Sequence, residues 1–529
     1  MKKEKNKKDD KLGGLRVKIS DLLTSKYQKI ISEKKDVNHK IYIHVGPTNS
    51  GKTYSSLQDL IKADKGVYLG PLRLLAWEVY EKLSKEGTPC TLLTGEEQII
   101  TPNSKVDSCT VELFNPGKEY DVAIIDECQL LNDPNRGYAW TKAILYMKAQ
   151  VLHLIVAPYG LSIVEKLLKR TNRKYEIINH ERFSPLKMAT KPDNPAKPIP
   201  KTIYVTFSRI EALKLKDELE HKYNMPTSII YGNLPPEVKQ KQADNFLTGV
   251  TQLMVATDAI GLGLNLPAER VCFTETSKFD GIEARPLHAH EVQQIAGRAG
   301  RYGLTTEGEI SAFNKTDLTF IKNKLEEVPA QIKKAQIAPE VNELKVLNRP
   351  VLYDAMSTWK NLQAVPDNLK DIVEMSNLEE QIDLAKSLHF EKLDRSFTFE
   401  ECYELVKCPT TKETKKYWLK CIKALSENEY IPNPKQISLL QTENDLAFAE
   451  NAVKEHDIYL WFSYKKKYSN FTKNQSDILL SKSELSKCLD KFLMKKDSKM
   501  SKNCRSCDKR LDLNYAHRIC QQCFEQEYL

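Results

Sequence analysis

The sequence reads Gly46-Pro47-Thr48-Asn49-Ser50-Gly51-Lys52-Thr53 directly after an apolar run, and this octapeptide satisfies the pattern G-x-x-x-x-G-K-[ST]. The preceding residues 41–45 are apolar and β-branched and predict a buried strand, while the following residues have the spacing of a helix. Glycines let backbone N–H groups close on phosphates, and the N-terminal end of the helix adds positive charge. This context predicts a triphosphate site within an α/β domain.

The loop residues are predicted to bind ATP and Mg²⁺. Lys52 can supply a point charge to the β- and γ-phosphates, and Thr53 can supply a hydroxyl ligand to Mg²⁺. The predicted nucleotide-binding residues of the loop are Gly46, Thr48, Ser50, Gly51, Lys52 and Thr53.

An acidic pair, Asp126 and Glu127, ends the apolar strand predicted over residues 121–125. A carboxylate at the tip of a strand beside a phosphate loop can hold Mg²⁺ through water, which is the role predicted for Asp126. Glu127 can orient and deprotonate the attacking water. Acidic pairs at strand ends are common in loops, but the upstream phosphate loop favours the catalytic interpretation.

A second phosphate-handling segment, residues 293–301, contains Gln294, Arg298 and Arg301. Arg298 follows Gln294 by four residues on a predicted helix, so both lie on one face. The planar guanidinium stays charged and can bridge phosphate oxygens. The alternative is ordinary surface arginines. We predict that Gln294 and the two arginines reach the triphosphate from a second domain, so that hydrolysis depends on closure.

Strand-like and helix-like segments alternate through the first 325 residues, which is typical of doubly wound α/β domains. A proline-rich break interrupts the alternation and predicts a linker. Helical spacing dominates afterwards, and the aromatic stretch 455–468 favours core packing over base stacking. The predicted units are a basic N-terminal tail (1–37), a first domain (38–190), a linker (191–201), a second domain (202–325), a helical region (326–495) and a cysteine module (500–529).

Four of the twelve cysteines form the C-terminal pattern C-x₂-C-x₁₂-C-x₂-C. Two close pairs of thiolates suit a tetrahedral Zn²⁺ of the structural type, and the alternatives are a redox pair or coincidence. The predicted zinc ligands are Cys504, Cys507, Cys520 and Cys523, within a small zinc-knuckle-like module. Basic residues around this module suggest a contact with RNA or with a protein.

Composition narrows the class of protein and its partners. The chain has 529 residues and a formal net charge of +9, which is compatible with a polyanionic partner. No apolar run approaches the roughly 20 residues needed to cross a bilayer, so no membrane partner is expected. The first ten residues lack the apolar stretch of a secretory signal and contain little arginine. We therefore expect a soluble intracellular protein, in the cytoplasm rather than the mitochondrion.

In this order, the segments resemble a superfamily-two helicase of the DExH type. They are most similar to the mitochondrial RNA-degradosome helicases, a family of ATP-dependent RNA helicases. The resemblance covers roughly residues 40–490, and it implies two tandem RecA-like domains followed by a mainly helical region. Beyond the ATP site it rests on LTGEE (93–97), IYGNLPP (230–236), VATDAIGLGLNL (255–266), QIAGRAGRYG (294–303) and HDIYLWFSY (456–464).

The resemblance also implies site residues. Asp258 and Gly261 would lie near the ribose and phosphates of the nucleotide. The residues that would contact a sugar–phosphate backbone are Arg73, Thr94, Gly95, Ser208 and Thr257. Such contacts grip a strand without reading its sequence. Residues 156–160 depart from the family pattern, and none of them is assigned a role.

The combined prediction is an ATP-dependent RNA helicase that moves along a single strand and unwinds duplexes. The resemblance implies 3′-to-5′ movement. A DNA helicase or translocase remains an alternative, because the substrates differ by a 2′-hydroxyl that no residue is seen to read. A second alternative is an ATP switch that remodels RNA–protein complexes without unwinding. A metabolic kinase would need neither the second α/β domain nor the paired arginines. A nuclease or other protein partner is left open.

Overall fold

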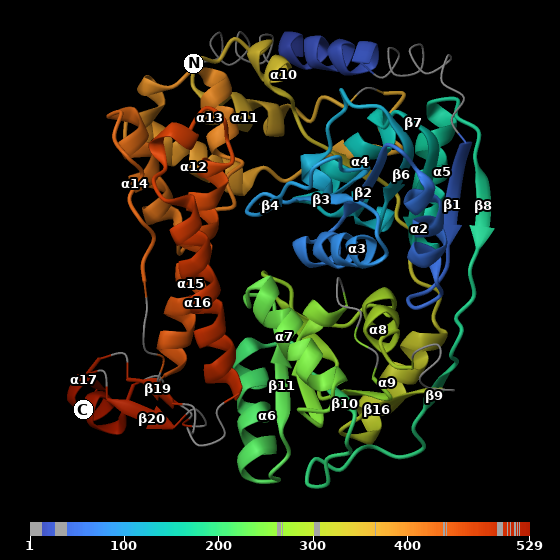
Figure 1. The fold of residues 1–529 in the computed structure, drawn as a ribbon, viewed down its shortest axis with the longest axis vertical. Helices are drawn as coiled ribbons and strands as arrows, with labels where there is room; N and C mark the ends of the chain where they lie inside the picture. Colours follow the sequence, from blue (N-terminus) through green and yellow to red (C-terminus); the bar gives the residue numbers. More distant parts are fainter. Residues whose placement is uncertain are drawn as a thin grey trace, which may run out of the picture.

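The computed structural model describes residues 13–26, 40–261, 266, 268–300, 307–365, 367–436, 440, 442–494, 501–504, 506–507, 509–512, 515, 517 and 519–528. Two α/β lobes lie one above the other in Figure 1, and the helices of the C-terminal region run along both of them. Arg301, which was predicted to reach the triphosphate, lies outside the described residues.

The first lobe is built on an eight-stranded sheet whose neighbouring strands are parallel except for the β3–β4 pair. Consecutive residues of β6 point into different cores. Ile124 packs on the face that carries α2 (Lys52–Lys62) and α3 (Arg73–Lys85), and Ile125 packs on the face that carries α4 (Gly137–Tyr146) and α5 (Leu161–Arg170). In spatial order the strands are β4 (Gln98–Ile99), β3 (Cys90–Leu93), β5 (Val106–Thr110), β2 (Gly66–Gly70), β6 (Tyr120–Ile125), β7 (Ala149–Val156), β1 (Lys40–Val45) and β8 (Glu176–Asn179).

The second lobe is built on a six-stranded parallel sheet. Its strands in spatial order are β11 (Thr227–Ile230), β12 (Leu253–Ala256), β10 (Thr202–Val205), β13 (Arg270–Phe273), β16 (Gly308–Ala312) and β9 (Leu186–Met188). Its helices are α6 (Arg209–His221), α7 (Pro236–Leu247), α8 (Ala289–Ala296) and α9 (Lys315–Glu326). A hairpin of β14 (Ser277–Phe279) and β15 (Ala284–Pro286) projects beside α8.

Two predicted boundaries are corrected by these pairings. Strand β9 lies inside the range predicted for the first domain but extends the second sheet. The start of the predicted linker also packs on that sheet. Buried Asp193 donates its backbone N–H to Ala312, and its carboxylate pairs with Arg270. A buried carboxylate needs such a partner, so this stretch belongs to the second lobe rather than to a free linker.

The described part of the predicted N-terminal tail, residues 13–26, is helical. Its Ile19 and Leu23 are buried in the large core that joins the first lobe to the C-terminal region. Lys26 pairs with Glu343 of the C-terminal region at 2.7 Å. These contacts explain why this stretch is ordered despite its charge.

The C-terminal region is mainly helical, as predicted, with one short parallel pair of strands, β17 (Ala335–Ile337) and β18 (Val373–Met375). Its helices are α10 (Val341–Lys345), α11 (Leu352–Leu362), α12 (Glu379–Phe390), α13 (Phe399–Leu405), α14 (Lys415–Ser426), α15 (Glu443–Ser463) and α16 (Gln475–Met494). The cysteine module contributes the antiparallel strands β19 (Ser501–Asn503) and β20 (Arg510–Asp512) and helix α17 (Gln521–Tyr528).

Helix α15 is buried in two different cores along its length. Its first half, with Leu446, Ala449 and Val453, packs into the core of the second lobe. Its second half, with Tyr459 and Phe462, packs into the core shared with the first lobe. The aromatic stretch is therefore core, as predicted. The single helix is held by both lobes at once (Figure 1).

Candidate nucleotide and nucleic-acid site

The phosphate loop lies between β1 and α2, and its lysine is folded onto the loop itself. Lys52 Nζ donates to the carbonyl oxygens of Gly46 at 2.7 Å and Pro47 at 2.5 Å. Burial lowers the pKa of Lys52, while Glu127 and Asp126 act to raise it. The ammonium thus sits at the centre of the loop, with carbonyl oxygens where phosphate oxygens are expected.

Two glycines are required by the shape of the loop. Gly51 has a φ of 78°, in the left-handed region that favours glycine. At Gly46, a Cβ atom would lie 2.4 Å from the carbonyl oxygen of His180. A side chain at either position would therefore distort the loop, which agrees with their predicted role in bringing backbone close to phosphates.

Asp126 and Thr53 lie together at the end of β6, as a shared Mg²⁺ site requires. Thr53 Oγ1 is 3.3 Å from Asp126 Oδ2, which also accepts from the Tyr68 hydroxyl at 2.9 Å. Burial, followed by the charge of Glu127, raises the pKa of Asp126 to about 6, against the hydrogen bond from Tyr68. A cation beside this carboxylate would relieve both unfavourable effects.

Glu127 is held by a residue that the motif analysis did not single out. Gln129 Nε2 donates to the Glu127 carboxylate, and Gln129 Oε1 accepts from the Ala157 N–H at 3.0 Å. Glu127 itself has a φ of 52°, so its backbone turns sharply at the strand end. Gln129 therefore links the predicted catalytic carboxylate to residues 156–160, for which the sequence allowed no assignment.

Arg298 reaches this region from the second lobe. It is partly buried, and its Nη2 donates to the Gly261 carbonyl at 2.5 Å. Burial lowers its pKa, and the opposing contribution comes first from Glu127 of the other lobe. Arg298 also acts to lower the pKa of Lys52. Charges from the two lobes thus influence one another, and Gln294 lies close to Gly261.

The two lobes also touch directly at the phosphate loop. Asn49 Nδ2 donates to the Gly300 carbonyl at 2.6 Å. Arg182 Nη1 donates to the carbonyls of Thr48 and Gly297, each at 2.9 Å. Arg182 belongs to no sequence motif, so nothing in the sequence pattern indicated that it bridges the loop and the Arg298 segment.

The residues predicted to contact a nucleic-acid strand come from both lobes. Arg73 opens helix α3 and pairs with Asp457 at 3.0 Å and Glu96 at 3.5 Å, beside a cavity between the lobes. Thr94 is buried and bonds the backbone of Glu97. The others lie at turns: Gly95 near Trp461, Ser208 capping α6 and Thr257 capping the short helix that starts at Asp258.

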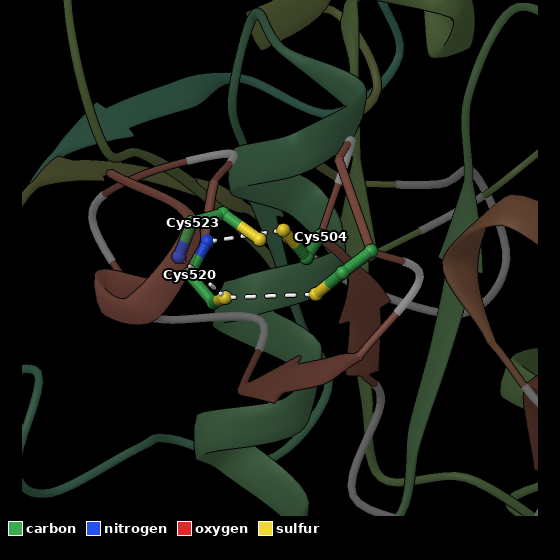
Figure 2. A group of neighbouring side chains, drawn as sticks. Cys504, Cys520 and Cys523 are labelled. Carbon is green, nitrogen blue, oxygen red and sulfur yellow. Dashed lines mark hydrogen bonds between the residues drawn. The ribbon is translucent and has the colours of Figure 1, made fainter. Parts of the chain in front are cut away.

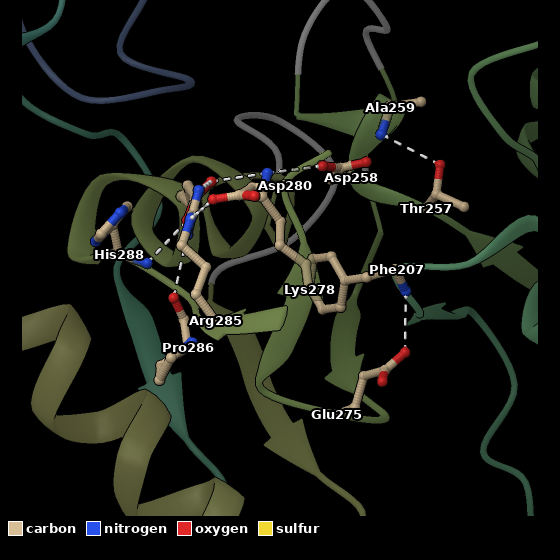
Figure 3. Close-up of polar contacts among 11 residues, drawn as sticks. Phe207, Thr257, Asp258, Ala259, Glu275, Lys278, Asp280, Arg285, Pro286 and His288 are labelled. Carbon is tan, nitrogen blue, oxygen red and sulfur yellow. Dashed lines mark hydrogen bonds and ion pairs between the residues drawn. The ribbon is translucent and has the colours of Figure 1, made fainter. Parts of the chain in front are cut away.

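Asp258 is oriented by the β14–β15 hairpin (Figure 3). Lys278 of the hairpin pairs with Asp258 at 3.0 Å and with Glu291 of α8 at 2.7 Å. Arg285 of the same hairpin also pairs with Glu291 at 2.9 Å. The hairpin therefore links the Asp258 turn to the helix that carries Gln294, although no sequence motif indicated a role for Lys278.

The four predicted zinc ligands converge in the C-terminal module, and Figure 2 labels three of them, Cys504, Cys520 and Cys523. Their sulfur atoms all lie within 4.8 Å of one another. The N–H of Cys520 donates to Cys504 Sγ at 3.1 Å, as backbone groups around a thiolate site do. Four sulfur donors at this separation fit one tetrahedral ion of the zinc type.

Comparison with known proteins gives two family matches. Residues 28–180 match the DEXQ-box helicase domain of Suv3, and residues 195–303 match the helicase conserved C-terminal domain. The mitochondrial DExH-box ATP-dependent RNA helicase DExH16 of Arabidopsis thaliana is 41% identical over 314 residues, covering 58% of this chain and 54% of that protein.

Two further relatives are ATP-dependent RNA helicases named SUV3. The mitochondrial helicase of Saccharomyces paradoxus is 37% identical over 352 residues, covering 64% of this chain and 48% of that protein. The mitochondrial homolog of Drosophila melanogaster is 33% identical over 474 residues, covering 85% and 61%. The chain thus spans about half the length of the first two relatives, and somewhat more of the third.

The predicted preference for the cytoplasm over the mitochondrion is wrong by this comparison, because all three relatives are named mitochondrial. That expectation rested on the first ten residues, which lie outside the described part of the chain. Among the described helices, none combines the length and the hydropathy that crossing a bilayer requires.

Proposed function

Because the chain carries a Suv3-type DEXQ-box helicase domain followed by a helicase conserved C-terminal domain, we propose that it is an ATP-dependent RNA helicase. It couples ATP hydrolysis to movement along a single strand and to duplex unwinding. The observation that carries this proposal is the direct contact between the phosphate loop and the Arg298 segment of the second lobe, through Asn49–Gly300 and through Arg182, which joins Thr48 to Gly297.

In this proposal the chain's own residues prepare the phosphates for attack by water. Lys52 exchanges the carbonyls of Gly46 and Pro47 for phosphate oxygens. Thr53 and Asp126 hold Mg²⁺, which neutralises charge on the β- and γ-phosphates when bound. Glu127, oriented by Gln129, accepts a proton from the attacking water.

The second lobe completes the site. Arg298 stabilises the charge that develops on the transferred phosphoryl group, because its guanidinium stays protonated and can bridge two oxygens. Gln294 and Arg301 are assigned to the triphosphate as well, and Asp258 and Gly261 to the ribose and phosphates. The Asn49–Gly300 contact shows how closely this face approaches the phosphate loop.

The nucleic-acid strand is proposed to run across both lobes beneath helix α15. Arg73, Thr94 and Gly95 of the first lobe and Ser208 and Thr257 of the second are assigned to its backbone. RNA is the favoured substrate because the relatives are named RNA helicases, and 3′-to-5′ movement follows from the resemblance. The cysteine module is proposed to hold one structural Zn²⁺.

One experiment tests the function. ATP turnover is measured with and without RNA, and strand displacement is measured on RNA and DNA duplexes with 3′ or 5′ overhangs. RNA-stimulated turnover with displacement of RNA from a 3′ overhang is expected, and Lys52→Ala should abolish both. Stimulation without displacement would favour an RNA–protein remodelling switch. Displacement of DNA alone would favour the DNA helicase.

A further inference from the structure

A cavity of about 480 Å³ lies where three parts of the chain meet. The N-terminal end of α3 contributes Arg73, the second lobe contributes the turn 232–236 and Lys239 of α7, and α15 contributes Lys454. Gly232 in the turn faces open space, because a Cβ atom there would meet nothing within 4 Å. The cavity is therefore open to a chain-like ligand that approaches the backbone closely.

The acidic groups in the cavity wall are each paired with a cation. Asp258 pairs with Lys278 at 3.0 Å. Glu450 pairs with Arg209 at 3.2 Å and accepts from the Tyr231 hydroxyl at 2.5 Å. Asp457 pairs with Lys482 at 2.9 Å as well as with Arg73. Of these carboxylates, Glu450 also interacts electrostatically with Lys454, while the charges that act on Lys239 are those of Arg73 and Lys454.

Those two lysines, Lys239 and Lys454, contact neutral oxygen atoms only, within the part of the chain that the structure describes. Lys239 Nζ donates to the Gly232 carbonyl at 2.8 Å, and Lys454 Nζ is 3.4 Å from Asn233 Oδ1. Burial, followed by the charges of Arg73 and Lys454, lowers the pKa of Lys239 to about 8. The charge of Lys454 also acts on Glu413, whereas both charges that lower the pKa of Lys239 are positive, so an anion beside Lys239 would be stabilised.

We propose that Lys239 and Lys454 together bind a phosphate of the RNA strand, so that the C-terminal region supplies one side of the strand's path. The proposal rests on the proposed function and adds two residues to it. One lysine comes from the second lobe and the other from α15, so a strand phosphate held here joins these two parts directly. The contact is to the backbone and is independent of base sequence.

The test measures binding of a fluorescein-labelled oligouridylate to the full chain by anisotropy across a series of NaCl concentrations. The variants are Lys239→Gln, Lys454→Gln and the double variant. Lys241→Gln is the matched control, because Lys241 is exposed on the same helix and lies outside the cavity wall. Lys454→Arg preserves the charge and serves as the rescue variant.

Each single variant is expected to weaken RNA binding roughly threefold to tenfold and to reduce the salt slope by about 0.7, with larger losses in the double variant. Lys241→Gln should change affinity less than about twofold, and Lys454→Arg should restore binding. Turnover of ATP without RNA should be unchanged in every variant, since neither lysine lies in the nucleotide site.

The outcomes separate this proposal from the proposed function. If the wild-type chain binds RNA and RNA stimulates its ATPase, but the variants keep the affinity and salt slope of Lys241→Gln, the subsite is refuted and the function stands. If the wild-type chain neither binds RNA nor responds to it, both fail. Competition by inorganic phosphate beyond that of NaCl at equal ionic strength would assign the lysines to a free phosphate instead of the strand.

Discussion

Arg73 Nη1 donates to Asp457 Oδ2 across 3.0 Å, and this contact joins the first lobe to helix α15 of the C-terminal region. Both side chains are largely withdrawn from solvent. Burial acts to raise the pKa of Asp457, yet Arg73 and Lys482 hold it below its ordinary value. The carboxylate is therefore charged at neutral pH, and both cations depend on it.

We expect Asp457→Asn to destabilise the fold, because it leaves the buried Lys482 and the partly buried Arg73 without their shared anion. Breaking one partner of a buried pair typically costs about 3–5 kcal/mol. Urea denaturation followed by circular dichroism measures the loss. Glu484→Gln, at an exposed position of α16, is the control and should change stability by less than about 0.5 kcal/mol. Equal stability of the two variants would show that the pair contributes nothing.

Arg298→Ala should lower kcat for ATP hydrolysis by roughly 10³- to 10⁵-fold, the range known for arginine fingers. The reason is that the guanidinium acts on charge that develops in the transition state rather than on bound ATP. Binding of a fluorescent ATP analogue should consequently change far less than kcat. Arg170→Ala, which removes an exposed arginine of the first lobe, should leave kcat unchanged. A wild-type kcat in Arg298→Ala would contradict the two-lobed site.

Gln129→Leu should reduce kcat by up to about 100-fold while leaving KM for ATP nearly unchanged, because Gln129 positions Glu127 and does not face the nucleotide loop. The effect should vanish in a Glu127→Gln background, since the positioned carboxylate is then missing. Steady-state kinetics on the single and double variants measures this. A Gln129→Leu variant that raises KM alone would place Gln129 in nucleotide binding.

The pKa of about 6 for Asp126 predicts that the Mg²⁺ requirement of ATP hydrolysis depends on pH in the acidic range. A proton competes with Mg²⁺ below that pH, so the Mg²⁺ concentration for half-maximal ATPase should rise as pH falls through 6. The same protonation favours the Mg²⁺-free fold on the acid side, because the folded pKa exceeds the unfolded value of 3.8.

Tyr68→Phe sharpens this test. The tyrosine hydroxyl stabilises the carboxylate form of Asp126, so its removal should move this pH dependence to higher pH. Tyr54→Phe, at an exposed position on α2, is the control and should leave the pH dependence in place. A pH dependence that stays fixed in Tyr68→Phe would show that another group titrates.

Cys504→Ser should abolish bound zinc, measured by metal analysis of the purified protein, because a tetrahedral site that loses one of four thiolates binds far more weakly. Cys488→Ser on α16 should retain it. ATP turnover without RNA should persist in both variants, since the cysteine module lies away from the phosphate loop in Figure 1. Absence of zinc from the wild-type protein would contradict the assignment.

Short motifs were sufficient to predict which residues lie together at the phosphate loop, and single distant residues were not predictable. Lys52, Thr53 and Asp126 come together because a loop and a strand end adjoin in one parallel sheet, an arrangement with a local sequence signature. Arg182 bridges the lobes through three carbonyl groups. A hydrogen bond to a carbonyl requires no particular partner side chain, so no pattern marks such a residue.

In the fold, too, local sequence patterns were predictable and contacts between distant residues were not. Periodicity predicted the two α/β units and the helical region correctly. Buried positions recur at regular intervals along strands and helices, so apolar residues recur in the sequence with the same spacing. Strand β9 was missed because its three residues are too few for a period, and its place at the edge of the second sheet depends on pairing with distant β16. The charge pairs of α15 depend equally on partners from both lobes.

The embedding of helix α15 in two cores restricts the motions available to the molecule. A hinge confined to the stretch between the sheets cannot separate the lobes freely, because the helix ties them together a second time. Relative displacement has to bend α15 between Val453 and Ile458 or slide one of its halves within its core. The helix would then act as an elastic element that returns to its resting shape once the phosphate has left.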